Sequence, residues 1–467
     1  MRKNKLIFDI SELIRYLSSN KNYTGIQRVV VMVLREFQKI NSRGNIWICF
    51  TSPRYKEYIA FELVTLNFHN WESPSKTYQF LCDLGILGPE SLIFKYKNNP
   101  FKYYLHRTRF DFAAYFKNHK IFNKRNIHIH EWKNYRRSKK IYKPHFEKLT
   151  NILEVDDKLI LIDSTWLPIN VNMYFKVKEY GVKIYTFVYD LIPILFPAYM
   201  VKEMNLAFYS WLSKSIEYTD FYITDSESCK KDLLAFLESH NSKLEVKVLP
   251  LVQIGVPSKI QKPKNSFNNE YLNQFHEIGG LELHCKNVLA DKFILSVGTL
   301  EIRKNLWRLV LAWKKLLDQG YSDIPRLVLV GKRGWNNTHF WDLMNSTGNL
   351  YGYVSILENV NDMELEALYK NCLFVAMVSR YEGWGLPVGE ALSYGKTAVV
   401  SNTSSLPEVG RDLVEYCDPA SIESIANSVK KLVYQPDYRK SLENKIKHTQ
   451  LRNWEDVAND LATLLKS

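Results

Sequence analysis

The sequence predicts an α/β protein of two domains, each built on a parallel sheet with helices on both faces. In the second half, short apolar runs typical of buried strands alternate with amphipathic helical patterns. The first half shows a similar alternation, interrupted by a long aromatic and basic stretch. A polar, irregular stretch with proline and glycine separates the two halves, and 467 residues suffice for two or three domains.

The first domain is expected at residues 1–255, with an insert at about 68–157 where regular patterning fails. Its predicted strands are residues 6–10, 46–50, 158–163, 183–189, 221–224 and 244–249, and its predicted helices are 26–40 and 227–237. Residues 256–290 are expected to form a linker.

The second domain is expected at residues 291–450 and shows the more regular alternation. Its predicted strands are residues 293–297, 326–330, 354–357, 373–377 and 397–401. Its predicted helices are 306–317, 340–344, 363–369, 387–394 and 422–434, with Asn305 as a suitable N-cap and Gly395 as a helix end. Sheets of this kind bind ligands at the carboxyl ends of their strands.

Charge and cysteine content narrow the class of protein. Residues 95–150 hold 16 Lys/Arg against three acidic residues, so nearly all of the formal net charge of +14 lies in this segment. Interleaved aromatics fit an anionic membrane surface or a nucleic acid, and a solvated insert with a small core of its own is an equal alternative. Six scattered cysteines without a C-x-x-C pair, and the lack of a signal peptide or spanning helix, favour the cytoplasm.

Two glutamates, Glu382 and Glu390, bracket a glycine-rich loop and the start of a predicted helix, directly after a predicted buried strand. Gly383 and Gly385 allow the backbone to approach a ligand closely, and Pro387 suits the first turn of the helix. Helix N-termini bind anions through unpaired N–H groups and the macrodipole. Carboxylates suit hydroxyl groups beside such an anion. An anion flanked by hydroxyl groups is the chemistry of a nucleotide sugar.

A second loop, residues 298–305, follows the strand predicted at 293–297. It places Arg303 and Lys304 at the start of a helix, where the dipole disfavours cations unless an anion is bound. Two solvated charges on a surface loop are the alternative from this loop alone. Because both loops follow strands of one sheet, we interpret them together as a binding site for a phosphate-containing ligand.

Three segments of the second half resemble signatures of glycosyltransferase family 4: VGTLEIRKN (297–305), YEGWGLPVGEAL (381–392) and SSLPE (404–408). Members of that family are retaining enzymes of the GT-B fold, with two Rossmann-like domains facing a central cleft. The resemblance is strong over about 290–435 and weaker over 24–28, 188–193 and 224–227. Residues 451–467 resemble the family's last helix, which crosses back onto the first domain.

The resemblance implies that Glu390 holds the ribose hydroxyls of the donor and that Glu382 lies near the donor sugar. It also implies that Lys304, helped by Arg303, clamps the diphosphate, so the expected catalytic residues are Glu382, Lys304 and Arg303. The expected donor-binding residues are Glu390, Gly298, Thr299, Gly383, Trp384, Gly385, Leu386 and Pro387, with weaker candidates Gly25, Tyr189, Asp190 and Glu408. Thr299 stands where many relatives have arginine, and Tyr189 stands where many have histidine.

The function implied is a retaining glycosyltransferase that moves a sugar from a nucleoside-diphosphate sugar to a glycan or lipid-linked glycan acceptor. It would form an α-glycosidic bond, with a role in capsule or lipopolysaccharide biosynthesis at the inner face of the cell membrane. The resemblance implies that no cofactor and no metal are needed, and the sequence has no D-x-D motif to argue otherwise. The alternatives are a basic nucleic-acid-binding protein, or another GT-B enzyme such as an epimerase or a phosphorylase.

Overall fold

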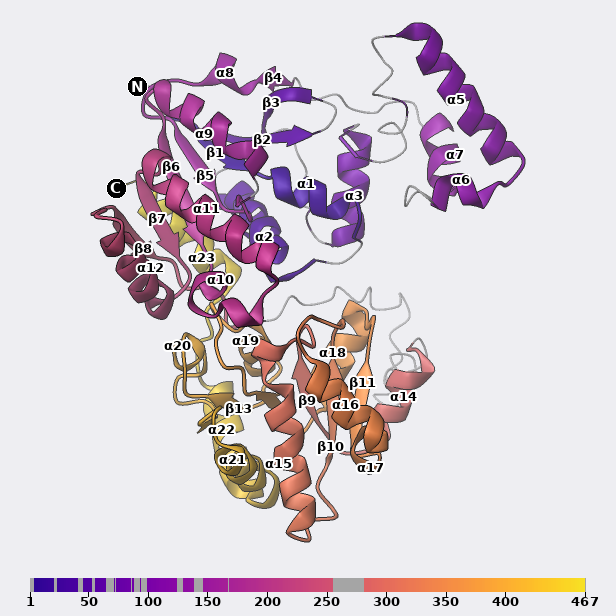
Figure 1. The fold of residues 1–467 in the computed structure, drawn as a ribbon, viewed down its shortest axis with the longest axis vertical. Helices are drawn as coiled ribbons and strands as arrows, with labels where there is room; N and C mark the ends of the chain where they lie inside the picture. The colour runs from indigo at the N-terminus through magenta and orange to yellow at the C-terminus, as the bar shows by residue number, and fades with distance from the viewer. Residues whose placement is uncertain are drawn as a thin grey trace.

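The computed structural model describes residues 4–20, 23–40, 45–52, 55–63, 71, 73–84, 86–87, 93, 99–123, 129–137, 146–166, 168–254 and 281–466. Two α/β domains lie one above the other in Figure 1, and each is built on its own sheet. The predicted α/β class is confirmed. Among the helices of these ranges, none has the length and apolarity needed to cross a bilayer.

The first sheet has the strand order β4-β3-β2-β1-β5-β6-β7-β8. The strands are β1 (Leu6–Asp9), β2 (Ile46–Ser52), β3 (Tyr55–Glu62), β4 (Glu147–Lys148), β5 (Lys158–Leu161), β6 (Lys183–Val188), β7 (Phe221–Thr224) and β8 (Glu245–Val248). The predicted parallel sheet is confirmed over β2, β1, β5, β6, β7 and β8, and one edge adds two antiparallel pairings, of β3 with β2 and of β4 with β3. Alternate residues enter opposite cores, with Ile7 packed on one face and Phe8 on the other.

Helices cover both faces of the first sheet. They are α1 (Ser11–Leu17), α2 (Gly25–Ile40), α3 (Pro74–Asp83), α8 (Leu149–Ile152), α9 (Pro168–Glu179), α10 (Ile192–Leu195), η3 (Pro197–Tyr199), α11 (Lys202–Tyr218) and α12 (Glu227–Ser239). The helical stripe predicted from residue 26 is confirmed by α2, whose buried side includes Val30, Leu34 and Phe37.

The second sheet has the order β11-β10-β9-β12-β13-β14 and is parallel throughout. Its strands are β9 (Phe293–Val297), β10 (Arg326–Val330), β11 (Val354–Leu357), β12 (Val375–Met377), β13 (Ala398–Ser401) and β14 (Glu415–Cys417). The order reverses between β9 and β12, which makes their carboxyl ends the expected ligand crevice of a doubly wound sheet. The two loops singled out in the sequence follow these two strands.

The helices of the second half are η4 (Ile302–Lys304), α15 (Leu306–Asp318), α16 (Thr338–Ser346), α17 (Gly348–Tyr351), α18 (Asp362–Asn371), α19 (Leu386–Ser393), α20 (Leu406–Gly410), α21 (Ile422–Tyr434), α22 (Pro436–Lys447) and α23 (Trp454–Leu464). The last of these, α23, packs against α2 of the first domain. Of the expected linker, residues 256–280 lie outside the described residues, and its end forms α14 (Leu283–Leu289).

Part of the expected insert folds into three helices, α5 (Pro100–Tyr115), α6 (His119–Asn123) and α7 (Ile129–Arg137). They project from the side of the first domain (Figure 1). Phe110, Phe122 and Trp132 are buried together and form a small core between them. Residues 95–98, 124–128 and 138–145 of the basic segment lie outside the described residues.

Candidate active site between the domains

The loop after β9 is held to the loop after β12 by Asn305. Asn305 stands at the N-cap position of α15, as predicted, but its side chain makes no capping hydrogen bond to the helix. Its φ is +59°, and its amide nitrogen donates to the carbonyl oxygens of Val378 at 3.0 Å and Pro419 at 2.8 Å. The side chain therefore tethers loops instead of satisfying the helix. This tether keeps η4 beside the glycine-rich loop.

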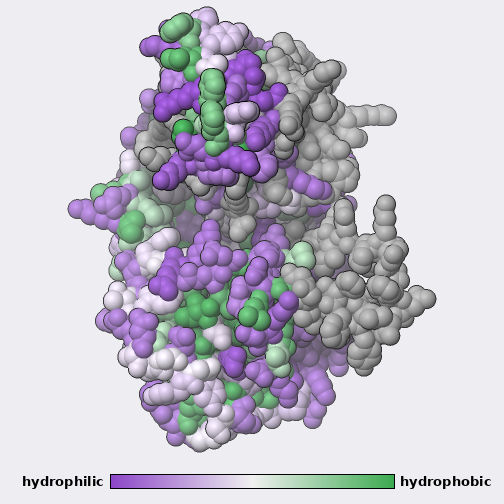
Figure 2. Space-filling view, turned by 90° about the vertical axis from the view of Figure 1, so that its right-hand side faces the viewer, coloured by the Kyte–Doolittle hydropathy of each residue, from purple (hydrophilic) through white to green (hydrophobic). Residues whose placement is uncertain are grey.

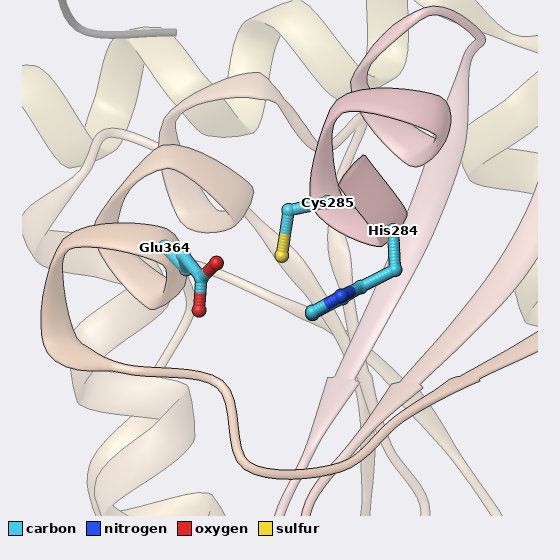
Figure 3. A group of neighbouring side chains, drawn as sticks. All are labelled: His284, Cys285 and Glu364. Atoms are coloured by element: carbon cyan, nitrogen blue, oxygen red, sulfur yellow. The ribbon is translucent and has the colours of Figure 1, made fainter. Parts of the chain in front are cut away.

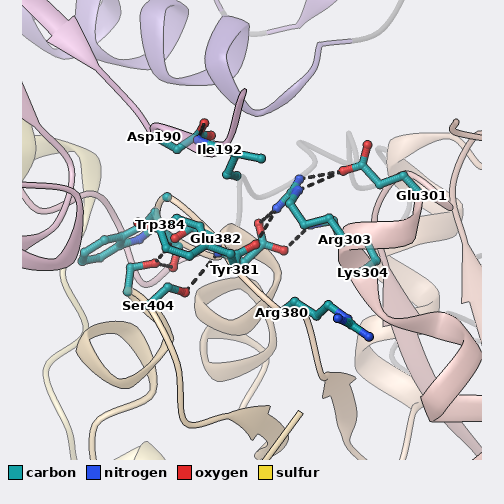
Figure 4. Close-up of polar contacts among 12 residues, drawn as sticks. Asp190, Ile192, Glu301, Arg303, Lys304, Arg380, Tyr381, Glu382, Trp384 and Ser404 are labelled. Carbon is teal, nitrogen blue, oxygen red and sulfur yellow. Dashed lines mark hydrogen bonds and ion pairs between the residues drawn. The ribbon is translucent and has the colours of Figure 1, made fainter. Parts of the chain in front are cut away.

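The three expected catalytic residues lie together at this point (Figure 4). The carboxylate of Glu382 accepts from Arg303 at 2.5 Å and from Lys304 Nζ at 2.6 Å. Arg303 also donates to Glu301 at 2.7 Å and to the carbonyl oxygen of Tyr381 at 2.9 Å. Two cations and two carboxylates thus balance one another in a largely buried cluster. Their catalytic role stays a prediction.

Electrostatics keep this cluster ionised. Burial alone would raise the pKa of Glu382, but Arg303 and Lys304 outweigh burial and lower it to about 2. Burial opposes the charged form of Arg303 as well, yet Glu382 and Glu301 raise its pKa. Burial lowers the pKa of Lys304, and Glu382 offsets part of that effect. The guanidinium and the carboxylate are therefore charged at every physiological pH.

Glu390, the expected ribose ligand, projects from α19 and has partners from two directions. Its carboxylate accepts from the hydroxyl of Tyr369 at 2.7 Å and forms an ion pair with Arg28. Arg28 belongs to α2 of the first domain, so this ion pair joins the domains. The sequence predicts neither partner of Glu390. No local pattern relates positions 362 residues apart, and only three-dimensional proximity reveals them.

The glycines of the loop make room for protein. We expected Gly383 and Gly385 to let the backbone approach a ligand. A β-carbon at Gly383 would lie 2.2 Å from the carbonyl oxygen of Tyr189, and one at Gly385 (φ +102°) would lie 2.5 Å from a methyl group of Leu406. Trp384 is buried, and its indole N–H donates to the carbonyl oxygen of Val252 at 2.9 Å. Gly383 and Trp384 therefore pack the second domain against the first, whereas Gly385 packs against α20 of its own domain.

The other expected donor-binding residues lie around the same point. Gly298 has φ +147°, and a β-carbon there would come within 3.1 Å of the Lys304 side chain. Thr299 is exposed, and Pro387 is half-buried in the first turn of α19, as predicted. Gly25 faces Leu386 across the gap, with 3.6 Å between a methyl group of Leu386 and the place of a β-carbon.

Glu408 serves the contact between the domains. Its two carboxylate oxygens accept from the backbone N–H groups of Glu227 at 2.9 Å and Ser228 at 3.0 Å, in the first turn of α12. A carboxylate at a helix N-terminus is favourable because it meets unpaired N–H groups and the positive dipole end. Ser226 adds a hydrogen bond of 2.9 Å to the carbonyl oxygen of Gly383. Glu408 therefore caps a helix of the opposite domain.

The first domain contributes a cavity of about 170 Å³ at the carboxyl ends of β5 and β6. Asp163, Tyr189 and Asp190 line it together with aromatic walls from Trp166, Phe208 and Trp211. The hydroxyl of Tyr189 donates to the carbonyl oxygen of Ile162 at 2.6 Å. Burial raises the pKa of Asp190, and Arg303 opposes part of the shift. Figure 4 shows Asp190 on the side of the first domain, facing Arg303 and Glu382.

The buried carboxyl group of Asp163 should make the free energy of unfolding depend on pH. Its carboxyl accepts from the backbone N–H groups of Leu13 at 2.5 Å and Ser164 at 2.8 Å, and burial raises its pKa to about 7. Because the folded-state pKa exceeds the unfolded value, folding favours the protonated form. Ionisation therefore costs nothing below about pH 4 and destabilises the fold increasingly up to about pH 7, by at most ~1.4 kcal/mol per pH unit.

Asp163→Asn cannot ionise, so its free energy of unfolding should rise relative to the parent as the pH increases over that window. Urea unfolding at several pH values measures the difference, with the exposed Asp342→Asn as control. A difference that is the same at all these pH values would contradict the prediction.

A group of side chains that could ligate a metal lies away from this site. Within the described residues, His284, Cys285 and Glu364 form one such group, with ligand atoms within 4.8 Å of one another (Figure 3). The Glu364 carboxylate already accepts from the backbone N–H groups of Asn361 at 3.0 Å and Glu282 at 3.1 Å. Burial raises the pKa of the Cys285 thiol to about 12. This arrangement is that of a helix cap joined to α14.

Known proteins resemble this chain most clearly in its second half. Residues 286–449 match the family model described as "Glycosyl transferases group 1". The chain is 35% identical over 147 residues to O-antigen chain mannosyltransferase B of Escherichia coli, which is 32% of this chain and 38% of that protein. It is 25% identical over 281 residues to the serotype-specific mannosyltransferase WbdA of Escherichia coli, which is 59% of this chain and 33% of that protein. The chain thus spans between 33% and 38% of the length of these relatives.

Solved structures agree on the fold. Anabaena HepE in complex with UDP and glucose has a TM-score of 0.57 and 13% identity, and the match covers 100% of both chains. A glycosyltransferase from Rickettsia africae has a TM-score of 0.54 and 15% identity, covering 100% of this chain and 98% of that one. At these identities the likeness is one of fold. The GT-B architecture implied by the resemblance is confirmed.

Proposed function

We propose that this chain, whose residues 286–449 form a domain of the glycosyl transferases group 1 family, transfers a sugar from a nucleoside-diphosphate sugar to a glycan acceptor. The transfer would retain the configuration of the sugar and form an α-glycosidic bond. The observation that carries the proposal is the buried cluster of Glu382, Arg303 and Lys304, with Glu390 on the helix that follows.

The chemistry proposed for the cluster is stabilisation of the leaving group. Glu382 holds Lys304 and Arg303 in fixed positions, so little reorganisation is needed when a diphosphate binds. As the bond between sugar and phosphate breaks, negative charge grows on the diphosphate, and the two cations stabilise it. The departing phosphate would take the proton of the attacking acceptor hydroxyl on the same face of the sugar. Such a path requires no protein base.

The acceptor would bind in the first-domain cavity. Its aromatic walls suit the apolar faces of a sugar ring, and Asp163 and Asp190 suit its hydroxyl groups. Both carboxyl groups are buried, so they make hydrogen bonds that are little weakened by water. A polymer of an O-antigen or capsule type, carried on a lipid, is the acceptor class we propose.

A donor panel tests the proposal. GDP-mannose comes first, because the relatives described above are named mannosyltransferases, followed by UDP and dTDP sugars. A ligand that binds only the folded chain raises the melting temperature. At a free ligand concentration of a hundred times the dissociation constant, it adds ~2.7 kcal/mol to the apparent free energy of unfolding. Transfer is then measured with an oligosaccharide acceptor, and the product's anomeric configuration by NMR. A β-linked product would refute retention, and turnover of the donor to an epimer would favour an epimerase.

Glu390→Gln tests the donor side of the proposal. The substitution removes a charged acceptor, and hydrogen bonds to charged groups contribute ~1.5–3 kcal/mol, so donor affinity should fall about 10- to 100-fold with the fold intact. Calorimetry with the nucleotide sugar measures the affinity. Glu423→Gln, an exposed glutamate on α21 of the same domain, is the control. Unchanged affinity in Glu390→Ala would remove Glu390 from the site.

Activity should survive chelation, since Lys304, Arg303 and helix N–H groups would carry the charge that a metal ion carries in other transferases. We expect the initial rate in excess EDTA to equal the rate without it. Loss of activity in EDTA that a divalent ion restores would contradict this expectation.

We place the reaction at the inner face of the cell membrane, where a lipid-linked glycan would present its growing end. The excess of basic residues in segment 95–150 supports this placement, because anionic lipids attract Lys and Arg near the surface.

A further inference from the structure

Helix α5 (Pro100–Tyr115) has two apolar faces, and its packing uses one of them. Phe110, Ala113 and Ala114 are buried against Phe122 of α6 and Trp132 of α7. This inner face gives the three-helix unit its core. The outer face plays no part in that core.

The outer face of α5 carries an apolar stripe, which Thr108 interrupts at its middle and the C-cap residue Phe116 extends at its end. Positions three and four residues apart lie on the same side of a helix, and the residues of this stripe follow that spacing. Between 56% and 79% of each of these side chains is exposed: Phe101, Tyr104, Leu105, Phe112, Tyr115 and Phe116. At 1.5 Å per residue the stripe is about 22 Å long. Figure 2, which faces this side of the molecule, shows apolar residues standing out among hydrophilic ones at the top.

Cations flank the stripe. Lys102 and Arg109 are exposed along one edge of it, and Arg107 lies over the ring of Tyr104 at 5.7 Å on the other. Asp111, the acidic residue of α5, accepts from Arg136 at 3.1 Å and from the indole N–H of Trp132 at 2.9 Å. Its charge is therefore matched within the unit. The surface left around the stripe is basic.

We propose that α5 lies in the plane of an anionic lipid surface, with the stripe facing the acyl chains and Lys102 and Arg109 at the headgroups. An interfacial helix has this composition, with phenylalanine and leucine on one side and Lys/Arg beside them. Tyr104 and Tyr115 suit the boundary between water and hydrocarbon. The inference deepens the proposed membrane site of action and is independent of the transfer chemistry.

Two other occupants fit the stripe less well. A second copy of the chain would bring Lys102 and Arg109 against the same cations of its partner, and like charges repel. Single-stranded nucleic acid would stack its bases on the aromatic rings, but Leu105 has no aromatic ring for a base to stack on and would stay exposed to water. Lipid satisfies the apolar residues and the cations at the same time.

Flotation of the full chain with vesicles tests the proposal in the absence of donor and acceptor. The vesicles contain either phosphatidylcholine alone or phosphatidylcholine with an equal part of phosphatidylglycerol. The stripe variant is Phe112→Ser/Phe116→Ser, and the charge variant is Lys102→Gln/Arg109→Gln. Matched controls in the second domain are Tyr351→Ser, with 71% of the side chain exposed, and Lys440→Gln/Lys447→Gln.

The parent should bind the anionic vesicles and leave the neutral ones. We expect the stripe variant to lose about tenfold or more of this binding. The charge variant should lose several-fold and show a weaker dependence on salt. Both controls should bind as the parent does. Melting temperatures equal to the parent's would show that the exposed substitutions leave the fold intact.

Three results would overturn the proposal. One is equal binding of the parent and the stripe variant to anionic vesicles. Another is self-association of the parent that the stripe variant abolishes while vesicle binding stays unchanged. The third is tight binding of single-stranded DNA that the stripe variant weakens, without vesicle binding by the parent. Donor binding by the same stripe variant reports separately on the proposed transfer function.

Discussion

Lys304→Ala should lower kcat by ~10²–10³-fold, the usual effect of removing one preorganised charge that stabilises a transition state. Lys304 Nζ lies 2.6 Å from Glu382 in a buried cluster, so solvent would not replace the lost charge. Steady-state kinetics with saturating donor measure kcat, and calorimetry measures donor affinity. Lys315→Ala, a partly exposed lysine of α15, is the matched control.

Arg303→Ala should lower kcat less than Lys304→Ala does. The Arg303 guanidinium shares its charge with Glu301, Glu382 and the carbonyl oxygen of Tyr381, so less of it acts on a ligand. Near-normal turnover in Lys304→Ala would mean that this loop does not clamp a diphosphate.

Glu382→Ala should abolish most activity and also destabilise the fold by ~3–5 kcal/mol, the usual cost of breaking a buried ion pair from one side. The substitution leaves Lys304 buried without its hydrogen-bonded counter-ion, whereas Arg303 keeps Glu301. Chemical denaturation measures the loss of unfolding free energy, and initial rates measure the activity.

A double variant separates the two effects of Glu382. Glu382→Ala/Lys304→Met removes the orphaned cation as well, so part of the unfolding free energy should return while activity stays lost. If the double variant is as unstable as the sum of the two single variants, the unpaired lysine is not the cause of the instability.

The second domain could be predicted closely from the sequence because its signals are local. Apolar runs such as residues 293–297 and 326–330 became β9 and β10, and Pro387 opens α19 as expected. Alternation of strands and helices predicted a parallel sheet, and in such a sheet two loops that each follow a strand lie at the same edge. Chemistry carried by consecutive residues is visible in a sequence.

What the sequence missed depends on distant partners. Strand β3 was not predicted because it pairs antiparallel with β2, and the alternation of strands and helices does not indicate such a pairing. Helix α5 was not predicted because it has apolar residues on two faces, so its sequence lacks the single apolar stripe by which an amphipathic helix is recognised. Arg28 and Tyr369 meet Glu390 only in the folded chain. The use of Asn305 as a tether likewise requires a knowledge of two further loops.

The close fit of Gly383 against Tyr189 bears on attempts to recombine transferases of this architecture. A β-carbon at Gly383 would meet the Tyr189 carbonyl oxygen at 2.2 Å, and one at Gly389 would meet the backbone of Gln253 at 2.8 Å. The main chain of each half is therefore shaped to fit closely against the main chain of the other. A hybrid that grafts a foreign second half onto this first half, in order to change the donor, needs glycine at both positions. In such hybrids, donor specificity can therefore be exchanged only if the residues of the domain interface are exchanged with it.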